Sequence, residues 1–346
     1  MDKKNYIERF VGIDILKIIS VIMILLLHFL GQGGVIEFTT GYSRFIFKAI
    51  QMFSLCAVNI LCICTGFFMS DKEYLRSRIA KTIALVLVVN VSILAVSIFM
   101  GYPLISGIYY IKLSISTTYW YVVDYIVLLL LMPFLNVLIL HLNKAELKRM
   151  ISIIIIVTMF LPFLIGTDAT GFNGGYSLAW MVFLFFVGAY EKKYSSCSKN
   201  KWMYFLGVII SYLLMMIIQY FARSMVMESL ENIIDLTMSY TSPFVFAMAL
   251  FWFKAFRNLR VNNKLHSTIK WFSNASLMAY IIHCNGFIYS IFLNDIFEPI
   301  CNNNFLIVFL IIAIAIVCYY FIVAVLNSIW NYCYRQIVFH INKRVG

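Results

Sequence analysis

The stretch that decides the fold is Val11–Leu30, VGIDILKIISVIMILLLHFL. As a helix rising ~1.5 Å per residue, it is long enough to cross the ~30 Å hydrocarbon core of a bilayer. It nevertheless carries Asp14, Lys17 and His28. At about 100° per residue, Lys17 and His28 return to within ~20° of the same helix face, and Asp14 lies on that face too. Because each charge buried in lipid costs at least ~2.5–3.5 kcal/mol on insertion scales, the pattern predicts a polar interior into which all three side chains point.

A simpler interpretation of the same helix needs no polar interior. Asp14 and Lys17 are three residues apart and can form an ion pair near one membrane surface, while His28 reaches the headgroup zone at the other surface. The sequence leaves both interpretations open.

The composition excludes a soluble globular protein. Hydrophobic residues make up 63% of the 346 residues, and charged residues make up 12%. Ten apolar runs predict an all-α, polytopic integral membrane protein with about ten transmembrane helices. These runs lie at roughly 11–30, 48–70, 79–100, 119–141, 149–166, 177–194, 202–221, 238–257, 272–293 and 305–330. No linker, low-complexity tract or repeat divides the chain, so we expect residues 1–346 to form a single membrane domain with no appended soluble domain.

The distribution of Lys and Arg predicts the topology. The tails and alternate loops place 22 of these residues on one side of the membrane and 4 on the other, with Lys17 inside a helix. By the positive-inside rule, both termini are predicted to be cytoplasmic. The net charge of +12 therefore reflects short cytoplasmic loops, and we expect no nucleic-acid partner. In this orientation Asp14 and Lys17 lie towards the cytoplasm and His28 lies towards the outside.

The cysteines give no sign of a metal site. The eight residues show no C-x-x-C pair and no His/Cys spacing typical of metal ligands. Cys62 and Cys64 lie two apart inside an apolar run, where cysteine acts as a small hydrophobic residue. We therefore expect neither bound metal nor a disulfide framework.

The spacing in the first run resembles that of the acyltransferase-3 family, whose members are multi-pass bacterial membrane acyltransferases. Lys17-x10-His28 is similar to the family's basic residue, ten intervening residues and His, although the family usually has Arg in the place of Lys17. The segment TGF at 65–67 stands where Ser-Gly-Tyr or Ser-Gly-Phe is common in the family. The resemblance extends over nearly the whole chain, in several short motifs whose order agrees.

A basic cluster follows the second run, in CTGFFMSDKEYLRSRIAK. Arg78-x-x-Lys81 resembles the family's pair of basic residues three apart, and Arg76 adds a third charge beside them. On a helix Arg78 and Lys81 share one face, so the resemblance implies a cytoplasmic site for the phosphates of coenzyme A. The cluster can equally be a positive-inside anchor that touches anionic membrane lipid.

Further polar residues inside the apolar runs are candidates for contacting the substrate or supporting the site. Asp124, near the outer end of the fourth run, could orient a protonated imidazole, bind a sugar hydroxyl or pair with a cation in the bundle. Tyr280 and His283 share a helix face and resemble the family's late Tyr-x-x-His segment, although His283 could also be a helix-to-helix hydrogen-bond group. Asp14 is expected to support Lys17.

The resemblance implies a membrane-embedded acyltransferase that moves an acyl group, most often acetyl from acetyl-CoA, to a hydroxyl of a cell-surface polysaccharide or lipid-linked sugar. In that chemistry His28 is the catalytic base, and Lys17 is a cofactor or charge partner. Acyl-CoA is then a co-substrate, no cofactor is tightly bound, and the bacterial cell membrane is the implied location. Direct transfer and a transient acyl-His intermediate both remain open.

Other classes of function are compatible with parts of the pattern. An exporter or carrier of a polysaccharide or lipid-linked sugar could use the same polar face to conduct rather than to react. A secondary transporter also places charges in broken helices, but such folds commonly show related halves, and the sequence shows no repeat. A non-enzymatic anchoring protein would leave the Lys17-x10-His28 helix unexplained.

Overall fold

The computed structural model describes residues 10–72, 76–101, 119–168, 170–196, 200–224 and 231–345. Within these ranges the regular structure is entirely helical, as predicted. The helices are α1 (Val11–Leu30), α2 (Val35–Phe38), α3 (Gly41–Ser54), α4 (Ala57–Met69), α5 (Arg76–Phe99), α7 (Trp120–His141), α8 (Lys144–Ile155), α9 (Leu161–Ile165), α10 (Leu178–Lys193), α11 (Lys201–Ser224), α12 (Glu231–Met238), α13 (Pro243–Arg257), α14 (His266–His283) and α15 (Phe305–Val345). A π-helical turn, Ile156–Phe160, joins α8 to α9.

Eight segments of the described chain are long and apolar enough to cross a membrane. They are Val11–Leu30, Gly41–Met69, Arg76–Phe99, Trp120–His141, Lys144–Ile165, Lys201–Arg223, Asn232–Arg257 and Phe305–His340. The two remaining predicted runs coincide with α10, which has 16 residues, and with α14, which is rich in polar residues. The chain is therefore a multi-pass membrane protein. A total of ten crossings, with both termini in the cytoplasm, stays a prediction.

Several helix boundaries differ from the predicted ones. The run at 48–70 is divided between α3 and α4. The run at 272–293, predicted as one helix, is interrupted, because α14 ends at His283. The last helix continues to Val345, well beyond the predicted residue 330. Hydropathy does not detect the extension of α15, because polar helical turns outside the hydrocarbon layer are stable in the headgroup zone and in water.

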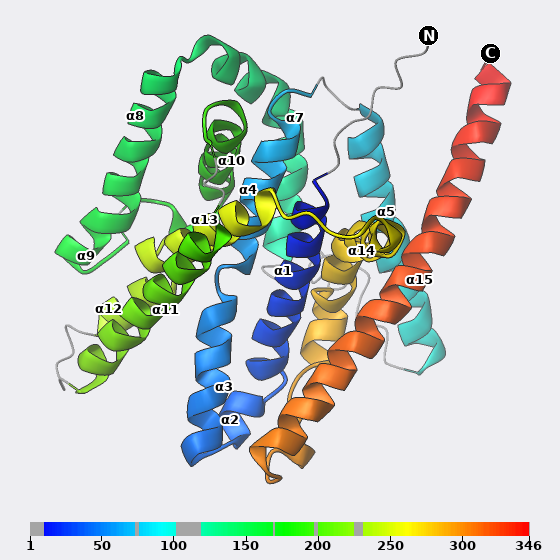
Figure 1. The fold of residues 1–346 in the computed structure, drawn as a ribbon. Coiled ribbons are helices and arrows are strands. Elements are labelled where there is room, and N and C mark those ends of the chain that lie inside the picture. Colours follow the sequence, from blue (N-terminus) through cyan, green and yellow to red (C-terminus); the bar gives the residue numbers. More distant parts are fainter. Residues whose placement is uncertain are drawn as a thin grey trace.

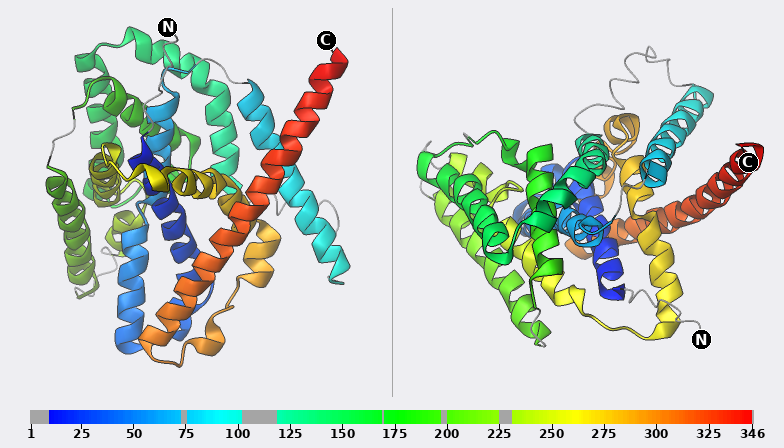
Figure 2. Two further views of the ribbon diagram at one scale, coloured as in Figure 1. Left: turned by 45° about the vertical axis from the view of Figure 1, so that its right-hand side comes forward. Right: turned by 90° about the horizontal axis from the view of Figure 1, so that it is seen from above.

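The first helix lies at the centre of the bundle (Figure 1). It packs against α3, α4, α13 and α14, which come from widely separated parts of the chain. The start of α1 and the end of α15 lie towards the same side of the molecule in Figures 1 and 2. On one flank α5 and α15 cross, and on the other flank lie α11, α12 and α13. This arrangement places both ends of α1 inside the protein, next to α14.

A close contact between α4 and α10 fixes the position of the TGF motif. A Cβ atom added to Gly66 would lie 2.2 Å from the Phe185 carbonyl oxygen, and one added to Gly188 would lie 2.2 Å from the Ile63 carbonyl oxygen. Two facing glycines therefore let these membrane helices approach backbone to backbone. The neighbouring Thr65 lines a cavity beside α1, so the motif joins helix packing to the site described next.

Candidate active site

The charged pair of α1 is held inside the bundle. The Lys17 ammonium lies 4.0 Å from Asp14 Oδ1 and 4.6 Å from the centre of the Phe68 ring. The Ser273 hydroxyl of α14 donates a hydrogen bond of 2.8 Å to Asp14 Oδ1. Pairing and hydrogen bonding offset part of the cost of burying these charges. The ion pair of the simpler interpretation is therefore present, and it faces α14.

A cavity of about 810 Å³ lies beside this pair. We call it the donor cavity, after the role that we propose for it below. Its basic side chains come from four helices: Lys17 of α1, Arg78 and Lys81 of α5, Lys270 of α14 and Arg335 of α15. Among the lining residues that the structure describes, none is acidic. A wall lined by positive charges attracts anions, and Arg and Lys are the side chains that bind phosphate groups. The donor cavity is therefore a candidate anion site.

Side chains of other helices orient the two α5 cations. Arg78 donates a hydrogen bond of 3.4 Å to the hydroxyl of Tyr125 on α7. Lys81 donates one of 2.6 Å to the side-chain oxygen of Asn331 on α15. Arg76, the third member of the predicted cluster, does not line the donor cavity. The structure thus brings Arg78 and Lys81 to Lys17 and leaves Arg76 apart from them.

Sequence patterns alone do not single out Lys270 and Arg335. Both lie in predicted cytoplasmic segments that are rich in basic residues, where the positive-inside rule already accounts for them. The packing of α14 and α15 against each other and against α1 brings these two side chains to the same cavity as Arg78.

A smaller cavity of about 230 Å³ lies at the other end of α1. We call it the acceptor cavity, likewise after its proposed role. Its polar and aromatic lining consists of His28, Trp120, Tyr176, Tyr240, Tyr280, Cys284 and Tyr289. No permanently charged side chain is among the described residues that line it. Tyr280 also lines the donor cavity, so the two cavities share one wall.

An interruption after α14 brings two side chains to His28. The helix ends at His283, and the side-chain oxygen of Asn285 accepts hydrogen bonds from the backbone N–H groups of Phe287 at 3.0 Å and Ile288 at 3.3 Å. The sequence Cys284-Asn285 therefore stops one helix, and the Asn285 side chain starts the next turn. An interruption at membrane depth is stable only where the protein satisfies its backbone groups, as happens here.

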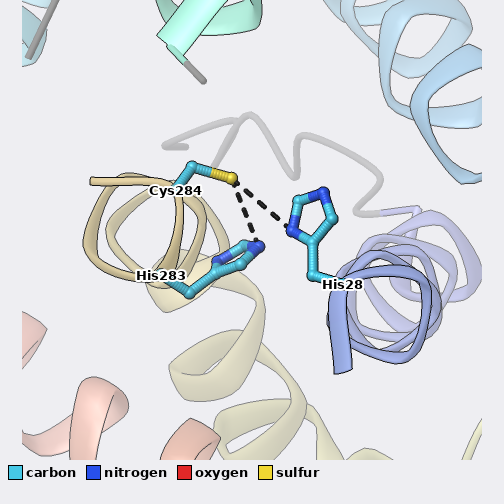
Figure 3. Close-up of side chains that lie close together, drawn as sticks. All are labelled: His28, His283 and Cys284. Atoms are coloured by element: carbon cyan, nitrogen blue, oxygen red, sulfur yellow. Dashed lines mark hydrogen bonds between the residues drawn. The ribbon is translucent and has the colours of Figure 1, made fainter. Parts of the chain in front are cut away.

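His28, His283 and Cys284 form a compact cluster. Figure 3 shows the side chains of His283, at the end of α14, and of Cys284, directly after it, directed towards His28 on α1. Cys284 Sγ lies 3.4 Å from His283 Nε2 and 3.8 Å from His28 Nδ1. One donor atom of each residue lies within 4.8 Å of the others, which is close enough for a borderline metal ion such as Zn²⁺. Sequence spacing gave no sign of this cluster because Cys284 and His28 are 256 residues apart.

Comparison with protein families identifies the class of the protein. The family described as Acyltransferase domain, acyltransferase-3, matches residues 10–324. The chain belongs to this family. Comparisons with curated proteins and with solved structures each gave no match. The resemblance read from the motifs is thus confirmed, and the protein is a membrane acyltransferase.

The acyltransferase does not bring every predicted residue to its cavities. Asp14 pairs with Lys17 at the donor cavity, and His283 contacts the ring of Tyr280, with 5.6 Å between ring centres. Asp124, in contrast, lies outside the linings of both cavities. A role for Asp124 in orienting an imidazole or binding a sugar stays a prediction.

Proposed function

We propose that this acyltransferase moves an acyl group, most simply acetyl from acetyl-CoA, to a hydroxyl of a cell-surface polysaccharide or lipid-linked sugar at the bacterial cell membrane. The observation that carries the proposal is the pair of cavities that meet at Tyr280. One cavity is lined by cations, and the other holds a histidine among aromatic rings. A donor with an anionic end and a reacting end matches such a pair.

The donor cavity suits the phosphorylated end of acyl-CoA. Its volume of about 810 Å³ lies within the ~300–1,000 Å³ typical of small-molecule sites. The phosphates of coenzyme A carry several negative charges, and Arg78 and Lys81 can hold them by charge-assisted hydrogen bonds. Anionic lipid headgroups share this phosphate chemistry, so the dependence of the rate on acyl-CoA concentration is the measurement that distinguishes the two ligands.

Lys17 and His28 serve opposite ends of the donor. Eleven residues apart on one helix, they are separated by ~16 Å along its axis. Over that distance Lys17 cannot contact the reacting carbonyl. We therefore assign Lys17 to the anionic part of acyl-CoA and His28 to the acyl group.

The transfer needs one general base. The acceptor hydroxyl oxygen attacks the thioester carbonyl carbon, and His28 takes the hydroxyl proton. When the tetrahedral intermediate collapses, the carbon–sulfur bond breaks and the same imidazole returns the proton to the departing sulfur. The products are an ester and free coenzyme A. Imidazole suits this exchange because it accepts and donates protons near neutral pH.

The acceptor cavity favours a neutral, hydroxylated ring. The aromatic faces of Trp120, Tyr176 and Tyr240 can pack against the C–H face of a sugar, and the tyrosine hydroxyls can bond its hydroxyl groups. Tyr176 is 50% exposed, so the acceptor can reach this wall from outside the bundle. A sugar hydroxyl arriving there would meet His28.

Membranes that contain the protein, supplied with labelled acetyl-CoA and surface glycan, test the proposal. We expect an ester-linked label on the glycan, and no label above background in membranes with equal amounts of the His28→Ala protein. An exporter would move glycan without consuming acetyl-CoA. Equal labelling by the two membrane preparations would refute acyl transfer by this site. Loss of one ester from the surface glycan of cells that lack the protein would identify the acceptor.

A further inference from the structure

The side chain that contacts both histidines is a buried thiol. Cys284 is 2% exposed, and its Sγ lies 3.4 Å from His283 Nε2 and 3.8 Å from His28 Nδ1 (Figure 3). The Tyr280 hydroxyl is also hydrogen-bonded to this thiol. A thiol can donate one hydrogen bond and accept two weak ones. Three neighbours therefore use the full hydrogen-bonding capacity of Cys284.

The direction of the hydrogen bonds follows from one backbone carbonyl. His283 Nδ1 lies 2.7 Å from the Ala279 carbonyl oxygen, which can only accept, so Nδ1 carries the proton of this neutral imidazole. His283 Nε2 is then an acceptor, and the Cys284 S–H must donate to it. Because the thiol has no second proton, His28 Nδ1 must be the donor in its contact with Sγ. The remaining nitrogen of His28, Nε2, is left with its lone pair free.

We propose that Cys284 and His283 are positioning residues that hold His28 in the tautomer required of a general base. This inference rests on the proposed acyl transfer. The chain of hydrogen bonds runs from His28 Nδ1–H to Cys284 Sγ, from Cys284 S–H to His283 Nε2, and from His283 Nδ1–H to the Ala279 carbonyl oxygen. The substrate proton enters and leaves at His28 Nε2, and no proton has to move along the chain.

The tautomer of a histidine decides whether it can act as a general base. A base in the wrong tautomer presents an N–H group to the substrate proton and cannot accept it, even though the ring occupies the correct place. The hydroxyl of Tyr319 donates a bond of 2.7 Å to the same Ala279 oxygen. This contact connects the Ala279 end of the hydrogen-bond chain to α15. Hydrogen bonds therefore link His28 of α1 to α14 and, through the Ala279 carbonyl oxygen, to α15.

Two alternative substitutions of Cys284 test the hydrogen-bond chain. Cys284→Ser keeps one donor and its acceptor capacity, whereas Cys284→Ala removes both and leaves a small apolar side chain that suits a buried site. We expect Cys284→Ala to lower kcat by about 10–100-fold, less than the ~10²–10⁴ of removing the base, and to leave KM for acyl-CoA within about twofold. Cys284→Ser should retain most of the rate. A thiol that only fills space predicts the reverse order, with Ala tolerated at least as well as Ser.

A second pair at His283 provides an independent test if a Cys284 variant is poorly folded. His283→Gln can place an oxygen acceptor near the position of Nε2, whereas His283→Met has similar size without one. The Gln variant should keep more of kcat than the Met variant, with protein amounts matched. Adding His283→Met to Cys284→Ala should cost little further rate, because both break the same chain.

Several results would overturn the inference. If the wild-type protein transfers the acyl group and Cys284→Ala and Cys284→Ser have equal kcat values, the hydrogen-bond chain is rejected and the proposed function stands. An acyl label on the wild-type protein that hydroxylamine releases and Cys284→Ala abolishes would also reject the chain, because Cys284 would then be a nucleophile. Stoichiometric bound metal that is required for activity would replace the hydrogen-bond chain by coordination. Absence of acyl transfer by the wild-type protein would remove the proposed function as well.

Discussion

The donor and acceptor cavities share a wall at Tyr280 but have opposite chemical character. The donor cavity collects basic side chains from four helices, whereas the acceptor cavity has aromatic walls and a histidine cluster. One helix, α1, supplies Lys17 to the first and His28 to the second. If the roles proposed for the cavities are correct, the protein binds the donor at one end of α1 and carries out the reaction at the other end. Changes in the donor cavity should then act on KM for acyl-CoA, and changes in the acceptor cavity should act on kcat or on KM for the glycan.

The largest contrast is expected from reporter fusions, which establish the side of the membrane that each cavity faces. Fusions after Gly34 and Gly171 should report an extracytoplasmic position, and fusions after Lys72 and Lys199 a cytoplasmic one, because the basic residues divide 22 to 4 between the two sides. Reporter activity in intact cells is the measurement. A reversed pattern at either pair would place the donor cavity on the wrong side for cytoplasmic acyl-CoA.

Replacing the base should give the largest loss of rate. His28→Ala should lower kcat by about 10²–10⁴-fold, as removal of a general base does, while binding of acyl-CoA changes little. Esterification and acyl-CoA binding, measured on equal amounts of membrane protein, check both halves of this prediction. Near-normal esterification by a well-expressed variant would remove the functional difference between the cavities and would favour a carrier.

Substitutions of Lys17 test the role of the other end of α1 in binding the donor. Lys17→Arg should be tolerated, because Arg keeps the charge and is the residue that the family usually has there. Lys17→Ala should lose most of the activity, on the order of 100-fold in kcat/KM, since it removes a contact to the donor and leaves Asp14 without its ion-pair partner. Thermal stability measured in parallel separates lost binding from lost folding. An Ala variant as active as the Arg variant would contradict the assignment.

The α5 cations should have a moderate effect that is confined to the donor. Replacing Arg78 and Lys81 together by Gln should raise KM for acyl-CoA by about tenfold, because both side chains are exposed to solvent, where an ion pair contributes ~0.2–1 kcal/mol. Arg76→Gln is the matched control, since Arg76 does not line the cavity, and its KM should stay unchanged. If both proteins show the same acyl-CoA dependence as the wild type, the cluster binds lipid or sets topology only.

The smallest effect is expected at the aromatic wall of the acceptor cavity. Tyr176→Ala should raise KM for the glycan about 2–10-fold, because an aromatic contact contributes ~0.5–1.5 kcal/mol, while Tyr176→Phe keeps the ring and most of the affinity. KM for acyl-CoA should not change in either variant. A larger effect on the donor than on the acceptor would mean that the two cavities are not divided as proposed.

The sequence allowed some, but not all, of the residues that line each cavity to be predicted. Lys17, Arg78 and Lys81 were recognisable because each lies in a spaced motif on one helix, and His28 because an imidazole in an apolar run is costly. Lys270 and Arg335 were hidden among topological charges, and Cys284 was hidden because cysteine is common in apolar helices. The interruption after His283 was also missed, because the segment CNGFIYSIF is mostly apolar and the turn signal Asn285-Gly286 in it was not used. Asp124 is a polar residue in a membrane helix that does not line either cavity, and its predicted role stays a prediction.

Composition, short motifs and helical geometry are read along the chain, so they were enough to establish the all-helical membrane class, the family and the distance between Lys17 and His28. The cations that share the donor cavity and the groups that surround His28 became apparent only once the helices were packed together. Those partners come from α5, α14 and α15. Their meeting depends on side-chain packing between helices, as at Gly66 and Gly188, and spacing along the chain carries no record of it.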